Sequence, residues 1–336
     1  MPIKKRNLDP SLVQWIMSET GLGPGIGEVK YVAPATSSTS QFRTQLESMG
    51  VSSGDIYTLP SLAEAAMEGY RNDVMLVAPG AYAETAEIAW DKANAHILGL
   101  GGPNAQAGDY SEPGVVIYTI TANVTQLLNI TGAYSQFHNF AVENYADDAD
   151  NLAAALINIY GITCKNVGFH GHMAATQNTT AAAASLYIGG AGMYPLLEDC
   201  QIGQDVWGTR SGANSAVMRF TGTGRPNGAT LRRCKFLSRS VTATCAMISV
   251  PVNTGIGRSW YFDNCHFSNF YDGTTLLNQV VYSVTGTQQF TIQLHNCSAA
   301  GFTEWQTGDF SIVTSDMPIT GTAGGLMKQP TGTVGN

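Results

Sequence analysis

Leu231-Arg232-Arg233-Cys234-Lys235-Phe236 is one of five similar frames that decide the fold of this chain. The others are Ile162-Thr163-Cys164-Lys165-Asn166, Leu197-Glu198-Asp199-Cys200-Gln201-Ile202, Phe262-Asp263-Asn264-Cys265-His266-Phe267 and Leu294-His295-Asn296-Cys297-Ser298-Ala299. Successive cysteines of these frames lie 36, 34, 31 and 32 residues apart. Self-similarity at this period indicates an array of stacked supersecondary units.

A run of strand-forming residues that ends in a turn former precedes each frame. These runs are 155–161, 185–190, 216–222, 247–253 and 280–286. A weaker copy of the unit occupies 127–132 and 137–142, with Asn139 or Phe140 near the cysteine position. Each unit therefore reads as strand, turn and strand.

A parallel β-helix fits this array better than helical repeats of similar length, which need long amphipathic helices. The residues three before and two after each cysteine are apolar in the last four frames. They are five positions apart, so strict alternation cannot place both on one face of a single strand. We therefore expect a bend just before the cysteine and thiols that stack inside the coil, about 4.8 Å apart.

The residues two before each cysteine carry charges whose sign alternates from unit to unit. In order they are Glu198, Arg232, Asp263 and His295. Stacked on the outside, they predict the contacts Glu198–Arg232 and Arg232–Asp263, each contributing about 0.2–1 kcal/mol. The alternation also disfavours a slip in register, because a slip would stack like charges.

These frames resemble the right-handed parallel β-helix, or pectin lyase-like, proteins. The resemblance includes a helix at Ser61-Leu62-Ala63-Glu64 with capping-box spacing, the segment Asp73–Tyr82 with its Pro79-Gly80-Ala81-Tyr82 ending, and a further coil at 95–102. It covers about 61–315 and implies an all-β solenoid. A fold of this kind does not define an activity.

The resemblance divides the chain into an N-terminal arm (1–60), the β-helix (61–315) and a Gly/Thr-rich tail (316–336). In the arm, Asp9-Pro10 predicts the start of a helix over Ser11–Glu19 that ends at Gly21. Residues 28–60 read as loop with one short helix near Gln41–Met49. We expect both ends to stay mobile or to pack on another subunit.

Composition excludes several classes of protein. Charged residues make up 12% of the 336, against about 25% in ordinary domains, while Gly 37 is high. The net charge of −8 argues against a nucleic-acid partner, with Lys4-Lys5-Arg6 a solvated terminus. No stretch reaches the length of a membrane span or a signal peptide. We expect synthesis in a reducing cytoplasm, with the six cysteines reduced or acting as ligands.

No convergent catalytic group is found. Asp147, Asp148 and Asp150 are a calcium site or a solvated loop, and His170-Gly171-His172 is half a metal site or an ordinary loop. Trp207, Trp260 and Trp305 are sugar platforms or packing anchors. The glycines of 21–27 do not follow a strand, so a phosphate loop is rejected. We assign no catalytic, cofactor-binding or metal-binding residues, and we expect no enzyme and no cofactor.

The segments Asn7–Pro34 and Gly69–Tyr82 resemble tailed-phage virion proteins. Three functions stay open: a structural virion protein, a tailspike-type glycan depolymerase, and a carbohydrate-binding adhesion module. The short arm favours the first, as a homotrimeric capsid decoration protein that binds the major capsid protein and stabilises the head. The implied location is the virion, assembled in the host cytoplasm, with a host-surface glycan as a further partner.

Overall fold

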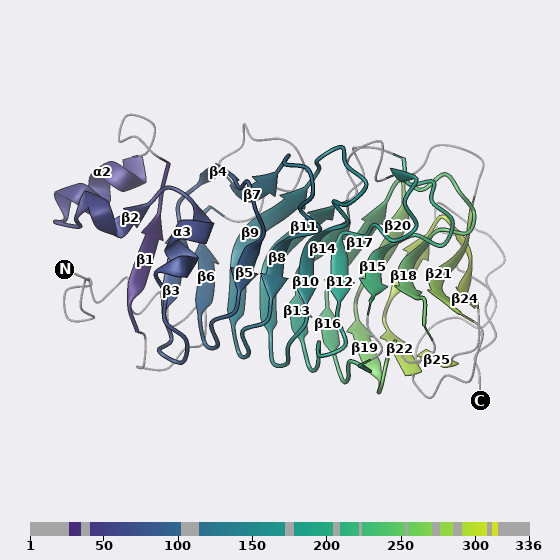
Figure 1. Cartoon of the computed structure of the whole chain (residues 1–336). Helices are drawn as coiled ribbons and strands as arrows, with labels where there is room; N and C mark the ends of the chain where they lie inside the picture. Colours follow the sequence, from purple (N-terminus) through teal and green to yellow (C-terminus); the bar gives the residue numbers. More distant parts are fainter. Residues whose placement is uncertain are drawn as a thin grey trace.

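The computed structural model describes residues 27–34, 41–101, 114–171, 178–203, 209–221, 224–252, 255–270, 276–284, 291–307 and 311–314. Figure 1 shows a stack of coils in which strands of successive coils lie side by side along one axis. All strand pairs are parallel, so the predicted right-handed parallel β-helix is confirmed. The predicted helix Ser11–Glu19 and the tail 316–336 lie outside the described residues.

Two parallel sheets form the walls of the coil. The long sheet has 17 strands: β1 (Val29–Val32), β2 (Ile56–Tyr57), β3 (Val74–Val77), β4 (Gly80–Ala83), β6 (His96–Gly99), β7 (Val115–Thr119), β9 (Gln136–Asn144), β11 (Thr163–Gly171), β13 (Leu196–Glu198), β14 (Gln201–Gly203), β16 (Thr230–Arg232), β17 (Lys235–Ser238), β19 (Trp260–Asp263), β20 (His266–Asn269), β22 (Thr291–His295), β23 (Ser298–Ala300) and β25 (Ser311–Thr314). The second sheet has eight: β5 (Ile88–Trp90), β8 (Gln126–Ile130), β10 (Ala153–Ile157), β12 (Leu186–Ile188), β15 (Ala216–Phe220), β18 (Ala246–Val250), β21 (Leu277–Ser283) and β24 (Phe302–Thr307).

The long sheet bends once in each coil, at a residue with positive φ. The column of bend residues is Asn139, Asn166, Asp199, Arg233, Asn264 and Asn296, with φ of 60, 54, 54, 51, 53 and 49°. Asn and Asp tolerate this left-handed conformation better than most residues. In β9 and β11 the strand continues through the bend, whereas later coils divide into two strands there.

The bend corrects the alignment of the first cysteine frame. Cys164 pairs in register with Phe137 on one side and Leu197 on the other, so it occupies the leucine position and not the cysteine position. Val167 occupies the cysteine position of this coil. It pairs with Phe140 in the preceding coil, and the next residue, Gly168, pairs with Gln201, the residue after Cys200. Asn166 provides the positive φ, and this places the bend two residues after Cys164.

The interior is apolar along the whole stack. The inward columns on either side of the bend are fully or almost fully buried: Phe137, Cys164, Leu197, Leu231, Phe262 and Leu294 on one side, and Phe140, Val167, Cys200, Cys234, Cys265 and Cys297 on the other. One continuous core cluster contains them all. Burial of stacked side chains in every coil therefore stabilises the solenoid.

The N-terminal end of the sheet differs from the sequence prediction. β1 pairs in parallel with β3 and β2, so the sheet begins at Val29 inside the segment assigned to the arm. The predicted short helix is confirmed as α2 (Gln41–Ser48), and Leu46 packs with the outward residues of β1, β3 and β6. A 3₁₀ turn, η2 (Ser53–Asp55), leads into β2. In the described part of the chain, no helix has the length and apolarity needed to cross a membrane.

The predicted capping box does not form. Helix α3 (Pro60–Ala65) begins one residue earlier, with Leu59 as N-cap and Pro60 in the first turn, a favourable place for proline. Ser61 Oγ donates instead to Glu84 Oε2 at 2.7 Å, and Glu64 Oε1 accepts from Lys92 Nζ at 2.7 Å. Both side chains thus tie α3 to neighbouring coils.

Candidate functional site

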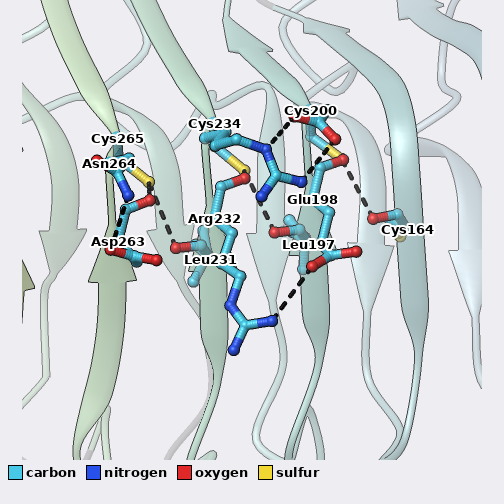
Figure 2. A network of polar contacts seen from close by, with 12 residues as sticks. Cys164, Leu197, Glu198, Cys200, Leu231, Arg232, Cys234, Asp263, Asn264 and Cys265 are labelled. Carbon is cyan, nitrogen blue, oxygen red and sulfur yellow. Dashed lines mark hydrogen bonds and ion pairs between the residues drawn. The ribbon is translucent and has the colours of Figure 1, made fainter.

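The thiol stack, Cys200, Cys234, Cys265 and Cys297, lies directly inside the bend. Each Sγ lies within hydrogen-bonding distance of two carbonyl oxygens. One belongs to the residue two before the cysteine, at 3.3–3.6 Å. The other belongs to the inward residue before the bend in the preceding coil, at 3.5 Å in all four cases: Cys164, Leu197, Leu231 and Phe262 in turn. Figure 2 shows this repeated contact for the first three thiols. The stack therefore links each coil to the one before it.

The thiols of the interior are poor nucleophiles. Neighbouring thiols, followed by burial, raise the pKa of Cys234, Cys265 and Cys297 above the usual range. Burial raises the pKa of Cys164 in the same direction. A thiol that keeps its proton is a weak nucleophile and metal ligand, so these four residues are structural.

Outside the bend, charges of opposite sign stack along the charge column, defined as Lys165, Glu198, Arg232, Asp263 and His295. Arg232 Nη1 lies 3.4 Å from Glu198 Oε1, which confirms the first predicted pair. Asp263 is in register with Arg232, but its Oδ1 lies 2.8 Å from His295 Nδ1 and 2.9 Å from Asn264 Nδ2. The alternation predicted from the sequence is present and begins one coil earlier, at Lys165.

A second ion pair lies in the column of bend residues. Arg233 Nε and Nη2 donate to Asp199 Oδ1 and Oδ2 at 2.7 and 2.9 Å. The hydrogen bond from Arg233 lowers the pKa of the Asp199 carboxyl. Two acids and two bases therefore neutralise one another at β13 and β16 and at the bend residues that follow these strands.

The aromatic candidates from the sequence are packing residues where the structure describes them. Trp260 is fully buried, with Nε1 donating to Pro226 O at 3.4 Å and its ring edge-on to Phe220 at 4.6 Å. Trp305 is 6% exposed and packs against Phe267. Neither offers a free face to a sugar. Trp207 lies outside the described residues.

The acidic candidates form a turn. Asp148 Oδ1 accepts from Asp150 N at 2.9 Å, while Asp147 and Asp150 are exposed. In the part of the chain that the structure describes, no three His, Cys, Asp or Glu side chains are grouped as metal ligands would be. The arrangement is that of a short turn closed by its own side chain.

His170, the first half of the predicted histidine pair, is fully buried against a carboxylate. Its Nδ1 lies 3.1 Å from Glu143 Oε1 of the neighbouring coil, and Glu143 is equally buried. Its Nε2 lies 3.3 Å from Gln201 Nε2. His172 lies outside the described residues. The sequence could not have paired Glu143 with His170, because they are 27 positions apart and meet through the β9–β11 register.

Asp73, at the start of the segment that suggested the fold, ties together three chain segments. Its Oδ1 accepts from Glu28 N at 2.8 Å and Arg71 Nε at 2.7 Å, and its Oδ2 accepts from Glu68 N at 2.9 Å. Burial by itself would raise the pKa of Asp73, but these hydrogen bonds lower it. Its role is to anchor the first coils.

Sequence reasoning overlooked three exposed tyrosines, Tyr70, Tyr134 and Tyr194, which we call the tyrosine row. Each lies shortly before a strand of the long sheet: β3, β9 and β13. The available signal was the pattern Gly-x-Tyr, at Gly132-Ala133-Tyr134 and Gly192-Met193-Tyr194. The exposed aromatic residues of these coils are therefore tyrosines, whereas Trp260 and Trp305 are buried.

Comparison with known proteins identifies the fold. A pectin methylesterase in complex with hexasaccharide VII matches with a TM-score of 0.53 and 17% identity, over 83% of this chain and 80% of the other. The deglycosylated pectin methylesterase of Aspergillus niger matches with a TM-score of 0.51 and 13% identity, over 87% and 85%. This chain therefore has the right-handed parallel β-helix fold that pectin methylesterases share.

A viral protein is among the weaker structural matches. ORF18 of Geobacillus virus E2 matches with a TM-score of 0.40 and 12% identity, over 76% of this chain and 57% of that one. No protein-family model matches the sequence, and no curated protein matches it significantly. The likeness to the pectin methylesterases establishes the fold and leaves the activity to be argued from the residues.

Proposed function

We propose that this chain is a structural protein of a tailed-phage particle, a homotrimeric decoration protein that binds the major capsid protein of the head. The observation that carries the proposal is the pairing of acids with bases on the outer wall of the long sheet. Glu198 binds Arg232, Asp199 binds Arg233 and Asp263 binds His295. A wall of this kind stabilises a rigid rod.

The same pairing argues against glycoside hydrolysis at these carboxylates. Glycosidases keep two carboxyl groups available on either side of the scissile bond, one as acid and one as base or nucleophile. Here the bidentate Arg233 contact holds Asp199 ionised, with its pKa lowered, and occupies both of its oxygens. A carboxylate held in this way is a poor general acid.

Further support comes from the sequence. Residues 7–34 and 69–82 resemble tailed-phage virion proteins, and a particle protein benefits from a fold that resists local opening. Bidentate and stacked contacts between coils supply that resistance, because every coil is bonded to its neighbours on both sides. Binding across capsid subunits would bury additional surface and so stabilise the head against internal pressure.

The test is a particle-binding experiment. Particles of the phage that encodes the chain are purified and examined by mass spectrometry and by electron cryomicroscopy of the head. We expect the chain in the particles and a β-helix on the outer shell, and a variant lacking residues 1–35 that folds but does not bind. A head map without this density, or release of reducing ends from host polysaccharide by the pure protein, would overturn the proposal.

A further inference from the structure

The tyrosine row has a regular backbone arrangement. Tyr70, Tyr134 and Tyr194 all have positive φ, at 63, 58 and 54°. Their side chains are 83, 56 and 54% exposed. Positive φ is unusual for a large aromatic residue and unfavourable for it. The fold therefore holds three aromatic side chains at turns where asparagine or glycine would be easier to accommodate.

Backbone hydrogen bonds set the spacing of the row. Tyr70 N donates to Ala93 O at 2.6 Å, and Asn94 N donates to Ala133 O at 2.8 Å. Tyr134 N then donates to Tyr160 O at 3.4 Å, and Gly161 N to Met193 O at 2.9 Å. Each step advances by one coil, so successive tyrosines lie two coils apart, about 10 Å along the axis of the stack. Tyr134 and Tyr194 lie two residues before β9 and β13, whereas Tyr70 lies four residues before β3.

The coils that follow Tyr134 and Tyr194 leave room for their rings. A Cβ atom on Gly161 would lie 2.7 Å from Tyr134 Cδ1, and one on Gly228 would lie 2.7 Å from Tyr194 Cδ1. Both glycines have positive φ, at 73 and 65°. The rings of Tyr134 and Tyr194 therefore each lie against the glycine of the next coil, where a side chain would displace the ring, whereas in the coil after Tyr70 the corresponding residue is Asn94. More than half of each of the three tyrosines stays in solvent.

Most residues next to the row in the sequence are small or polar. They are Thr131, Gly132, Ala133 and Ser135 for Tyr134, and Gly192, Pro195 and the larger, partly exposed Met193 for Tyr194. The exposed apolar neighbour is Tyr160, whose ring is edge-on to Tyr134 at 5.1 Å. The exposed rings of the row, with Tyr160 beside Tyr134, do not make the continuous apolar core of a protein interface. They suit a thin ligand that presents a flat apolar face at regular intervals.

We propose that the tyrosine row binds an extended β-(1→4)-linked polysaccharide, with one tyrosine under every second sugar. A pyranose ring in such a chain has a face of C–H groups that stacks on an aromatic ring, and its hydroxyls point sideways to water. The two-sugar repeat of a flat β-(1→4) chain is close to the separation of two coils. This binding is independent of the role in the particle and adds to it.

Calorimetric titration of the full chain with cellohexaose tests the proposal, with maltohexaose as the control of the same composition and a different shape. We expect binding of cellohexaose, weaker binding of shorter oligomers that reach fewer tyrosines, and no binding of maltohexaose. Each of the variants Tyr70→Asn, Tyr134→Asn and Tyr194→Asn should weaken binding about fivefold. Asparagine tolerates the positive φ, so the fold is preserved.

The matched control is Phe270→Asn, which removes an aromatic side chain of similar exposure, 49%, away from the row. It should leave the affinity unchanged. Equal binding by the triple tyrosine variant, or no binding of cellohexaose to the wild-type chain, would overturn the proposal. A triple variant that loses its oligomeric state in light scattering would overturn it in favour of a contact between copies of the chain. Failure here leaves particle binding intact, so the two proposals are tested separately.

Discussion

Arg233 binds Asp199 of the preceding coil through two hydrogen bonds, at 2.7 and 2.9 Å, and both residues lie at the bend of the long sheet with positive φ. The pair joins two requirements that conflict. The bend favours asparagine, as at Asn264 and Asn296 in the following coils. The outer surface of neighbouring coils favours opposite charges. Here the ion pair takes the place of two asparagines.

Reversing the charge of Arg233 tests the effect of charge between neighbouring coils separately from the effect of the bend conformation. Arg233→Asp stacks two carboxylates in adjacent coils and should lower the Tm, and the loss should shrink in high salt because both groups are exposed. Arg233→Asn, the matched control, should leave the Tm nearly unchanged, since asparagine suits the bend. Thermal melting at low and high ionic strength checks both. A salt-independent loss for Arg233→Asp would show that charge is not the cause.

The thiol stack should accept an apolar residue. Val167 holds the position of the thiols one coil before Cys200 and is buried. We expect Cys234→Val to change the free energy of unfolding by less than about 1.5 kcal/mol, the usual range for apolar exchanges of similar volume. Cys234→Asp places a charge in the same apolar site and should prevent folding or cost several kcal/mol. Urea denaturation measures the first and soluble yield the second.

Stability should fall as the solution becomes mildly acidic. Burial lowers the pKa of His96 and of His138 to about 4. Unfolded histidines titrate near 6.5, so between these values the unfolded chain binds more protons, and stability decreases as pH falls. The loss should be about 1.4 kcal/mol for each histidine between pH 7.5 and pH 5.5.

Urea denaturation across that range measures this loss. The window lies above the ordinary pKa of carboxyl groups. Burial raises the pKa of Glu64 and Glu84, and this acts in the opposite direction to the histidines. His266, whose pKa burial also lowers, contributes in the same direction as the two histidines. The double variant His96→Gln/His138→Gln should show a flatter dependence. An equally steep dependence in that variant would contradict the assignment.

The cysteine frames predicted the architecture because three signals agreed in four of the coils: the apolar residues, the thiol and the outward charge. They misplaced the first coil because only the thiol was used to align it. Cys164 lies 36 residues before Cys200, and in register it pairs with Leu197. Alignment on the bend residue Asn166 gives the correct register, since φ at the bend restricts the residue type more strongly than burial does.

Other features depend on contacts that no local pattern contains. β1 joins the sheet through its pairing with β2 and with β3, which lies 45 residues later, and its outward side is covered by α2. The tyrosine row emerges only when turns of alternate coils are stacked. Its residues are separated by 64 and 60 positions. The cysteines that reveal the repeat follow the strand before the bend, whereas the tyrosines precede that strand.

The bend itself can be tested at Asn264, which has a φ of 53°. Asn264→Ala keeps a small side chain but removes a residue type that tolerates this conformation, so it should cost about 1–2 kcal/mol. It also removes the hydrogen bond from Asn264 Nδ2 to Asp263 Oδ1, at 2.9 Å. Asn264→Gly removes that same bond while keeping the conformation accessible. If the backbone conformation determines the loss of stability, urea denaturation will find the glycine variant more stable than the alanine variant. The reverse order would attribute the loss of stability to the missing hydrogen bond and to chain entropy.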